Sequence, residues 1–254
     1  MPSRDRELDR YTREGALLFG GVLAILLQLG DPVVARGVAA HSGFAHDPLG
    51  RLRRTLEYVY AIRLGREQHE RLARQHVNRA HAGVPGARDA EHQLWVAATL
   101  YAVGIDTHER LVAPLADRTR DEIYAASARL GTALQLPAEA WPTTRADFDD
   151  YWNDQVAHLD FTPEARRVAA LLLHPSGPWW LRRVMPFVVE VTAALAPPSV
   201  RAPLGLTDDP ARHARALRRA RTLVRLTPGP LRRLPSRLLL RGLVAGRPHS
   251  ARMP

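Results

Sequence analysis

The sequence predicts an all-α protein built as a single globular domain of many helices. Valine and isoleucine are sparse beside leucine, alanine and arginine, which disfavours strands. No alternating apolar and polar segments and no βαβ spacing occur. At 254 residues the chain suffices for one large domain, and no low-complexity linker divides it. We expect a domain over residues 1–226, followed by a basic, proline-rich and partly ordered tail over 227–254.

The most apolar run covers residues 16–29 and predicts a buried helix. It is shorter than the roughly 18–20 residues that a membrane-spanning helix needs. Glu7, Asp9 and Glu14 precede it and no small-residue cleavage site follows, so it does not resemble a secretory signal. We therefore expect a cytoplasmic protein.

Glycine and proline divide the rest of the chain into further helices. In the first half we expect helices over 33–40, about 48–81 with a weak break at Gly65, 89–104 and 105–115. In the second half we expect helices over 117–134, a short one from Pro137, 145–157, about 164–174, 179–195 and 209–226. Thr144 and Asp147 resemble a capping box, which predicts a helix start at 145.

Composition excludes several classes of site. All 36 basic residues are arginine, so a P-loop lysine and a lysine Schiff base are both excluded. The chain has no cysteine, which excludes disulfides, thiolate nucleophiles, thiolate-ligated zinc and iron–sulfur clusters. A metal would have to bind histidine, carboxylate, tyrosine or one of three methionines.

The net charge of +10 comes from the C-terminal part of the chain. Residues 161–254 carry 17 arginines against 4 acidic residues, whereas residues 1–160 carry 19 against 22. One hypothesis is therefore a non-catalytic helical binding protein whose C-terminus docks on an anionic membrane or on nucleic acid. Few aromatic residues lie among these arginines, which disfavours nucleic acid.

One helical pattern can bind an anion. Arg51, Arg54 and Thr55 lie at i, i+3 and i+4, so they share one helix face. Two guanidiniums and a hydroxyl on one face suit a carboxylate, a phosphate or a haem propionate. The alternative is an exposed arginine face, because arginine is abundant throughout. No His-Glu-x-x-His, Glu-x-x-His, Gly-x-Ser-x-Gly or Gly-x-Gly-x-x-Gly motif occurs, and no group of histidines has zinc-site spacing.

Several phrases together resemble one family, that of the rubber oxygenase (latex-clearing protein) and the MpaB-type oxygenases. The quoted phrases are LQLGDPVVARGVAAHSGFAHDPLGRLRRTLEY, RQHVNRAHAGVPG, LWVAATLYAVGIDTHERLVAPL and LQLPAEAWPTTRADFDDYWNDQV, with a weaker likeness in LLHPSGPWWLRRVMPF and TAALAPPSVRAPLGL. The resemblance covers roughly residues 12–226 in order.

The resemblance implies a globin-like all-α fold and an oxidoreductase that uses haem b and O₂. The histidine of the His-x-x-Val-x-Gly phrase is His81, which the resemblance implies as the proximal iron ligand. It places Arg51, Arg54 and Thr55 near the haem, as cofactor-binding and catalytic residues. We expect a small hydrophobic or biosynthetic substrate; a membrane surface is not required.

Two customary histidines of the family are absent. Asp31 stands where the family has the histidine of Ala-His-Pro, and Ala97 stands where it has that of Trp-Val-His-Ala-Thr. Asp31 is a candidate local acid–base group. A family member that has lost haem and binds an apolar ligand in the same pocket is the remaining alternative.

Overall fold

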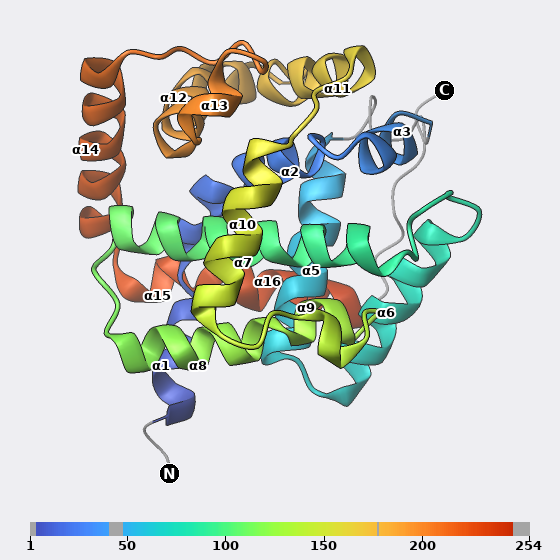
Figure 1. The fold of residues 1–254 in the computed structure, drawn as a ribbon. Helices are drawn as coiled ribbons and strands as arrows, with labels where there is room; N and C mark the ends of the chain where they lie inside the picture. The colour runs from blue at the N-terminus through green and yellow to red at the C-terminus, as the bar shows by residue number, and fades with distance from the viewer. Residues whose placement is uncertain (1–3, 41–47, 177, 246–254) are drawn as a thin grey trace.

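The computed structural model describes residues 4–40, 48–176 and 178–245, and these residues form helices and turns without a strand (Figure 1). The fold class is therefore all-α, as predicted. The first helices are α1 (Arg4–Thr12), the 3₁₀ helix η1 (Gly15–Gly20), α2 (Gly21–Gln28), α3 (Pro32–Ala40), α5 (Pro48–Leu64), α6 (Glu67–His81) and α7 (Ala90–Leu111). Then follow α8 (Asp117–Ser127), α9 (Arg129–Thr132), η2 (Ala138–Ala140), α10 (Arg145–Ala157), α11 (Pro163–Leu173), α12 (Trp179–Leu195), α13 (Pro198–Arg201), α14 (Pro210–Leu226), α15 (Gly229–Arg232) and α16 (Leu234–Val244).

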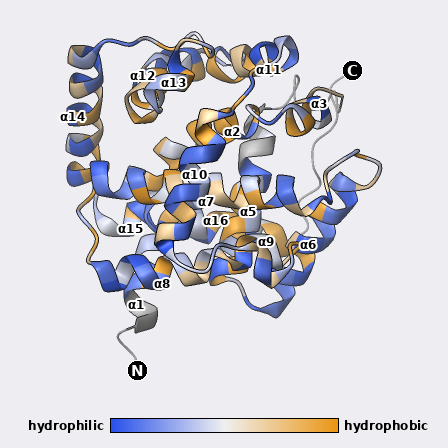
Figure 2. Cartoon of the chain, viewed as in Figure 1, coloured by the Kyte–Doolittle hydropathy of each residue, from blue (hydrophilic) through white to orange (hydrophobic). Residues whose placement is uncertain are grey.

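The core is organised around α2 and α7, which crosses the middle of the molecule (Figure 1). Residues 22–28 of α2 are all buried, which suits a helix that is apolar on every side (Figure 2). The indole Nε1 of Trp95 donates to the carbonyl oxygen of Leu27 at 3.2 Å. Gln28 Nε2 donates to Thr99 Oγ1 at 2.9 Å. These two hydrogen bonds satisfy polar groups inside the core and fix α7 against α2.

The apolar run 16–29 is buried as predicted, but it is divided between η1 and α2. The division falls at Gly20, where a Cβ atom would overlap Oγ1 of Thr107 on α7. No single described helix is long and apolar enough to cross a bilayer. The segments 15–28 and 32–40 pass that test together, by length and composition only, with a bend of 103° between them.

Helix α7 corrects the predicted break between residues 104 and 105. Its 22 residues are continuous. Gly104 sits there because the hydroxyl of Tyr11 packs against it, 2.6 Å from where a Cβ would lie. Glycine at this position makes room for a neighbouring side chain instead of ending a helix.

Other boundaries follow local signals closely. Thr144 Oγ1 accepts from the backbone N–H of Asp147 at 3.1 Å, and the Asp147 carboxylate accepts from the N–H of Thr144 at 3.0 Å. The predicted capping box is thus present, and α10 covers the predicted 145–157. The expected helix 117–134 is instead two helices, α8 and α9, that meet at Ala128.

The segment expected to be a tail contains α15 and α16. Helix α16 packs on α5 and α6 and buries Ser236 and Leu243. Arg232 Nη1 lies 2.8 Å from Glu14 Oε2, an ion pair between opposite ends of the chain. A Cβ on Gly15 would overlap the carbonyl oxygen of Arg232, so the two segments are in close contact. Residues 229–245 therefore belong to the packed fold.

Candidate functional site

Helices α5 and α6 form a hairpin around Gly65. The N–H of Gly65 closes α5 by donating to the carbonyl oxygen of Ala61 at 3.0 Å, and a Cβ here would overlap that same oxygen. The ring Nδ1 of His69 accepts from the N–H of Arg66 at 3.1 Å and so caps the start of α6. Ala61 and Ala73 are both buried, and such small residues allow two helices to lie close together.

The four predicted site residues lie at the far end of this hairpin. Thr55 and Arg51 are 10 and 14 residues before Gly65, and His81 is 15 residues after Arg66. At a rise of 1.5 Å per residue, all of them lie about 15–23 Å from the turn along their helices. The hairpin therefore brings the anion-binding pattern and the histidine to one end.

The side chains at this end differ in exposure. Arg54 is exposed, and Thr55 and His81 are half-buried, with Nδ1 of His81 shielded from solvent. The backbone of Arg51 lies in α5, and its side chain lies outside the described part of the structure. With Nδ1 enclosed, Nε2 is the nitrogen of His81 that an incoming group can reach.

The loop after His81 is held tightly against α3. Gly83 and Gly86 have φ values of 81° and 76°, in the left-handed region that favours glycine. A Cβ on Gly86 would overlap Cγ1 of Val33, and Val84 Cγ1 lies 2.9 Å from where a Cβ on Gly37 would be. The Val and Gly of the His-x-x-Val-x-Gly phrase are therefore packing residues that fix the loop.

A chain of amide side chains holds the last turn of α6 from the other side. Gln135 Nε2 donates to Asn78 Oδ1 at 2.8 Å, and Gln93 Nε2 donates to Gln135 Oε1 at 2.8 Å. Gln93 Oε1 in turn accepts from the backbone N–H of Gln135 at 3.1 Å. Gln93 Nε2 also lies 3.2 Å from the carbonyl oxygen of Ala87 in the loop. The network links α6, α7, the loop and residue 135, which lie far apart in sequence.

Asp31 and His92 form an ion pair beside this loop. Asp31 Oδ2 lies 2.5 Å from His92 Nδ1, and the two side chains are only 15% and 16% exposed. Asp31 Oδ1 also accepts from the N–H groups of Val33 and Val34, at 2.8 and 3.2 Å, which caps α3. The Cδ2–Nε2 edge of His92 faces Gly86. Asp31 was a candidate from the sequence, whereas His92 stood alone there and nothing in its spacing indicated a partner.

A buried hydroxyl lies near the same pair. Tyr151 Oη on α10 is enclosed and has no hydrogen-bond partner among the described residues. Burial raises the pKa of Tyr151 above its ordinary value, and the charges of Glu91 and Asp31 raise it further. Tyr151 is therefore a neutral phenol that retains its proton.

Ala97 does not replace the missing family histidine with another polar group. It is 2% exposed and packs in the core of α7. The adjacent buried polar residue, Thr99, has its hydroxyl committed to Val96 and Gln28. This position serves packing in this chain.

Comparison with known proteins gives two findings. A family model described as the catalytic domain of ER-bound oxygenase mpaB/B'/Rubber oxygenase matches residues 9–226. The chain is 35% identical over 197 residues to the uncharacterized proteins Mb2261 of Mycobacterium bovis and Rv2237 of Mycobacterium tuberculosis, a match that covers 72% of this chain and 77% of each relative. No solved structure matches the chain. The family match includes the hairpin, the loop and α14, and it ends before α15 and α16.

Proposed function

The chain belongs to the mpaB/rubber oxygenase catalytic-domain family, and from this premise we propose that it is a haem b-dependent oxygenase with His81 as the protein ligand of the iron. In this proposal Arg51, Arg54 and Thr55 bind and orient the haem propionates. O₂ and a small hydrophobic or biosynthetic molecule are the substrates.

The observation that carries the proposal is the shared end of the α5–α6 hairpin. A haem needs an imidazole for its iron and cationic or hydroxyl donors for its carboxylates. One helix of the hairpin carries His81 and the other carries the Arg/Thr face, at matching distances from the turn. The Gln93–Gln135–Asn78 hydrogen bonds keep the last turn of α6 in position.

The donor set suits haem better than a bare metal ion. Within residues 4–40, 48–176 and 178–245, no three His, Asp or Glu side chains gather closely enough to hold a metal by themselves. A porphyrin supplies four nitrogens, so a single imidazole completes the protein's share of the iron ligands. His81 is one such imidazole.

Bound haem supplies the one-electron and oxygen chemistry, while the protein binds, orients and moves protons. Asp31 Oδ2 accepts the Nδ1 proton of His92, so the His92 Nε2 lone pair remains a proton acceptor on the side of Gly86. The pair can therefore take up or return a proton beside the loop that follows His81. Tyr151 keeps its own proton and excludes charge from the same region.

The optical spectrum tests this function directly. Protein purified from haem-supplemented cells should show a Soret band, and His81→Ala should abolish or shift it. His158→Ala, at an exposed histidine on the end of α10, is the matched control and should keep the wild-type spectrum.

Two results would contradict the proposal. A colourless wild-type protein that does not take up added haemin, with no bound iron, would favour a haem-free member of the family. A Soret band that is identical in wild type and His81→Ala would leave haem in place but reject His81 as its ligand.

A further inference from the structure

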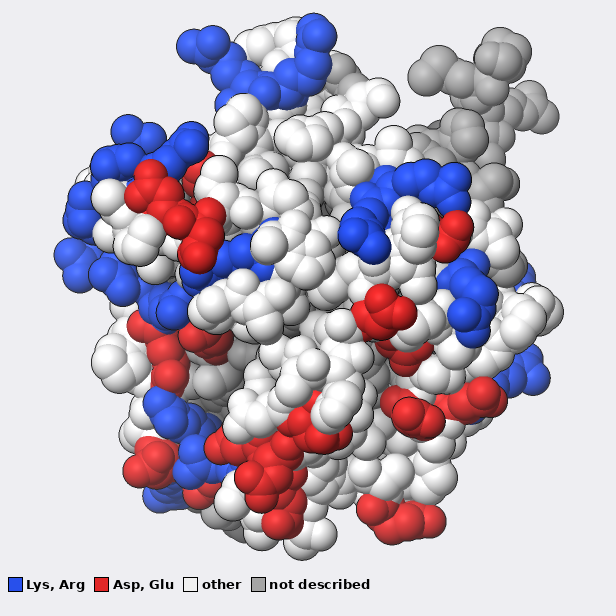
Figure 3. Space-filling model, turned by 45° about the horizontal axis from the view of Figure 1, so that its top comes forward, with Lys and Arg blue, Asp and Glu red and all other residues white. Residues whose placement is uncertain are grey.

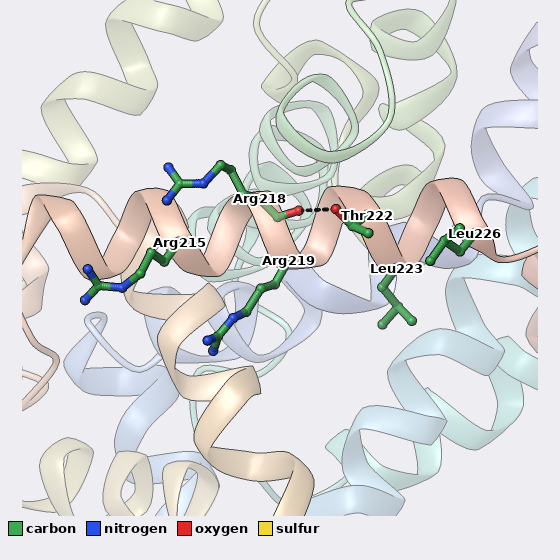
Figure 4. A pocket seen from close by; sticks show the side chains of 6 residues that line it. All are labelled: Arg215, Arg218, Arg219, Thr222, Leu223 and Leu226. Atoms are coloured by element: carbon green, nitrogen blue, oxygen red, sulfur yellow. Dashed lines mark hydrogen bonds between the residues drawn. The ribbon is translucent and has the colours of Figure 1, made fainter.

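Helix α14 carries an unusual exposed face. Arg215, Arg218, Arg219, Thr222, Leu223 and Leu226 line a shallow hollow of about 420 Å³ along this single helix (Figure 4). We call this set the α14 stripe. Its arginines occupy the middle of the helix and its leucines the last turns. The opposite side of α14 buries His213, Ala216, Ala220 and Val224 and packs on α12.

Large apolar side chains at the end of the stripe are open to water. Leu226 is 76% exposed and Leu223 is 50% exposed, although both are long aliphatic residues. The exposure continues past the helix end, because Leu231 in α15 is 57% exposed only five residues after Leu226. A cluster of exposed leucines is typical of a surface that becomes covered by a partner or a membrane.

The same segment is strongly basic. Residues 210–245 contain ten arginines and no acidic residue. Arg212 pairs with Glu190 and Arg232 with Glu14. No carboxylate of the described chain pairs with Arg215, Arg218 or Arg219, so the stripe presents uncompensated positive charge. Figure 3 shows blue side chains gathered on the left flank, which α14 forms in Figure 1.

We propose that the α14 stripe docks on the surface of an anionic lipid bilayer. In this arrangement α14 lies in the plane of the interface. Leu223, Leu226 and Leu231 enter the boundary between headgroups and acyl chains. The guanidiniums of Arg215, Arg218 and Arg219 bind lipid phosphates, for which the planar, bidentate guanidinium is well suited.

Charge and composition favour a bilayer over the other occupants. A second copy of the chain would bring two arginine faces together, which is unfavourable. Single-stranded nucleic acid is bound by aromatic side chains among the basic ones, and residues 210–245 contain no aromatic residue. Exposed leucines add nothing to phosphate-backbone binding, whereas a bilayer uses both the leucines and the arginines of the stripe.

The docking surface and the proposed haem site are separate. In Figure 1, α14 forms the left edge of the molecule and α6, which carries His81, lies at the right. Membrane docking therefore does not depend on haem binding, and the two proposals fail independently. The Soret band reports on one and vesicle binding on the other.

Sedimentation of the full-length protein with vesicles tests the proposal. We expect binding to vesicles of phosphatidylcholine with one quarter phosphatidylglycerol, and far weaker binding to phosphatidylcholine alone. Replacing Arg215, Arg218 and Arg219 by Gln should weaken the partition coefficient roughly 100-fold, at about tenfold or slightly less for each charge. Leu226→Ser should weaken it roughly tenfold, and high salt should weaken mainly the arginine contribution.

Matched variants control for total charge and exposed leucine. The triple change Arg71→Gln, Arg166→Gln and Arg167→Gln removes the same charge from other exposed helix faces, and Leu171→Ser changes a leucine that is 37% exposed on α11. Both should bind like wild type. The stripe residues are exposed, so the folded state should survive their replacement, which far-UV circular dichroism checks.

Three outcomes would overturn the proposal. The first is equal binding to neutral and anionic vesicles, or no binding to either. The second is an equal loss of binding in the stripe triple variant and in the scattered control. The third is arginine-dependent binding to DNA or RNA without vesicle binding, which would assign the surface to nucleic acid.

Discussion

Asp31 and His92 are 61 positions apart in the chain, and their side chains meet at 2.5 Å in a nearly enclosed position. Asp31 caps α3, and His92 lies in the first turns of α7 against the loop that follows His81. The pair thus connects three segments around the proposed haem site. It combines a structural cap with a proton-holding group.

Replacing Asp31 should separate these two roles. Asp31→Ala removes both the α3 cap and the partner of His92, and we expect a loss of about 2–3 kcal/mol in the free energy of unfolding. Asp31→Asn keeps an oxygen for the N–H groups of Val33 and Val34 but not the charge, and should cost about 1 kcal/mol. Urea unfolding at neutral pH measures both. Equal losses for the two variants would mean that the cap contributes nothing.

Local signals account for the helices that the sequence predicted well. The Thr144–Asp147 capping box fixes the start of α10 through two hydrogen bonds within four residues. Gly83 and Gly86 end α6 because both adopt positive φ. These features depend on neighbours in the chain, and a single sequence contains those neighbours.

Contacts between distant segments account for what the sequence did not show. Gly104 looked like a helix break, but its role is to accommodate Tyr11 from α1. His92 looked isolated because Asp31 reaches it only after α3 and α7 have packed. The helical character of residues 229–244 was missed because five prolines in the last 27 residues suggested a tail, although Pro230 and Pro235 fall in first turns, where proline is tolerated. Long-range packing has no signature in one sequence.

The two glycines after His81 form a matched pair for mutation. Both have positive φ, but Gly83 has open space around it whereas Gly86 faces Val33. Gly83→Ala should cost about 1 kcal/mol from backbone strain alone. Gly86→Ala adds a steric overlap and should cost about 3 kcal/mol. The double change Gly86→Ala with Val33→Ala should recover part of the difference.

Thermal or urea unfolding of the three variants measures this, and equal losses at the two glycines would contradict the packing role of Gly86. Haem titration of the same variants has a separate use. If the loop positions His81, Gly86→Ala should also weaken haem affinity more than Gly83→Ala does.

The α5 side of the proposed haem site makes its own prediction. Arg54→Ala removes a cation that we assign to a propionate, so haem affinity should fall roughly 10- to 100-fold. Thr55→Val keeps the shape of the side chain and removes the hydroxyl, and should lower affinity by about tenfold or less. Titration of the haem-free protein with haemin, followed at the Soret band, gives both values.

Arg71→Ala is the control for Arg54, because Arg71 is 62% exposed on α6 and pairs only loosely with Glu67 at 3.9 Å. It should leave haem affinity unchanged. A similar loss in Arg71→Ala and Arg54→Ala would indicate a general effect of positive charge on haem uptake, contrary to a specific contact with Arg54.

His108 should make stability depend on pH. It is 9% exposed, and its Nδ1 donates to the carbonyl oxygen of Ala113 at 3.1 Å. Burial lowers the pKa of His108 in the folded state, while Glu14 and Glu109 raise it to a smaller extent and Arg232 lowers it. The ring is therefore held neutral where an unfolded histidine, with a pKa of about 6.5, takes up a proton.

Because the unfolded chain binds this proton and the folded chain does not, the free energy of unfolding should fall as the pH drops below about 6.5, by at most about 1.4 kcal/mol per pH unit from this group. The loss should end at the lowered folded-state pKa. His108→Asn keeps a donor toward Ala113 and removes the titration, so its stability should fall less steeply between pH 7.5 and 5. Urea unfolding across this range measures the two slopes, with exposed His174→Asn as the control that keeps the wild-type slope. Parallel curves for wild type and His108→Asn would show that another group causes the pH dependence.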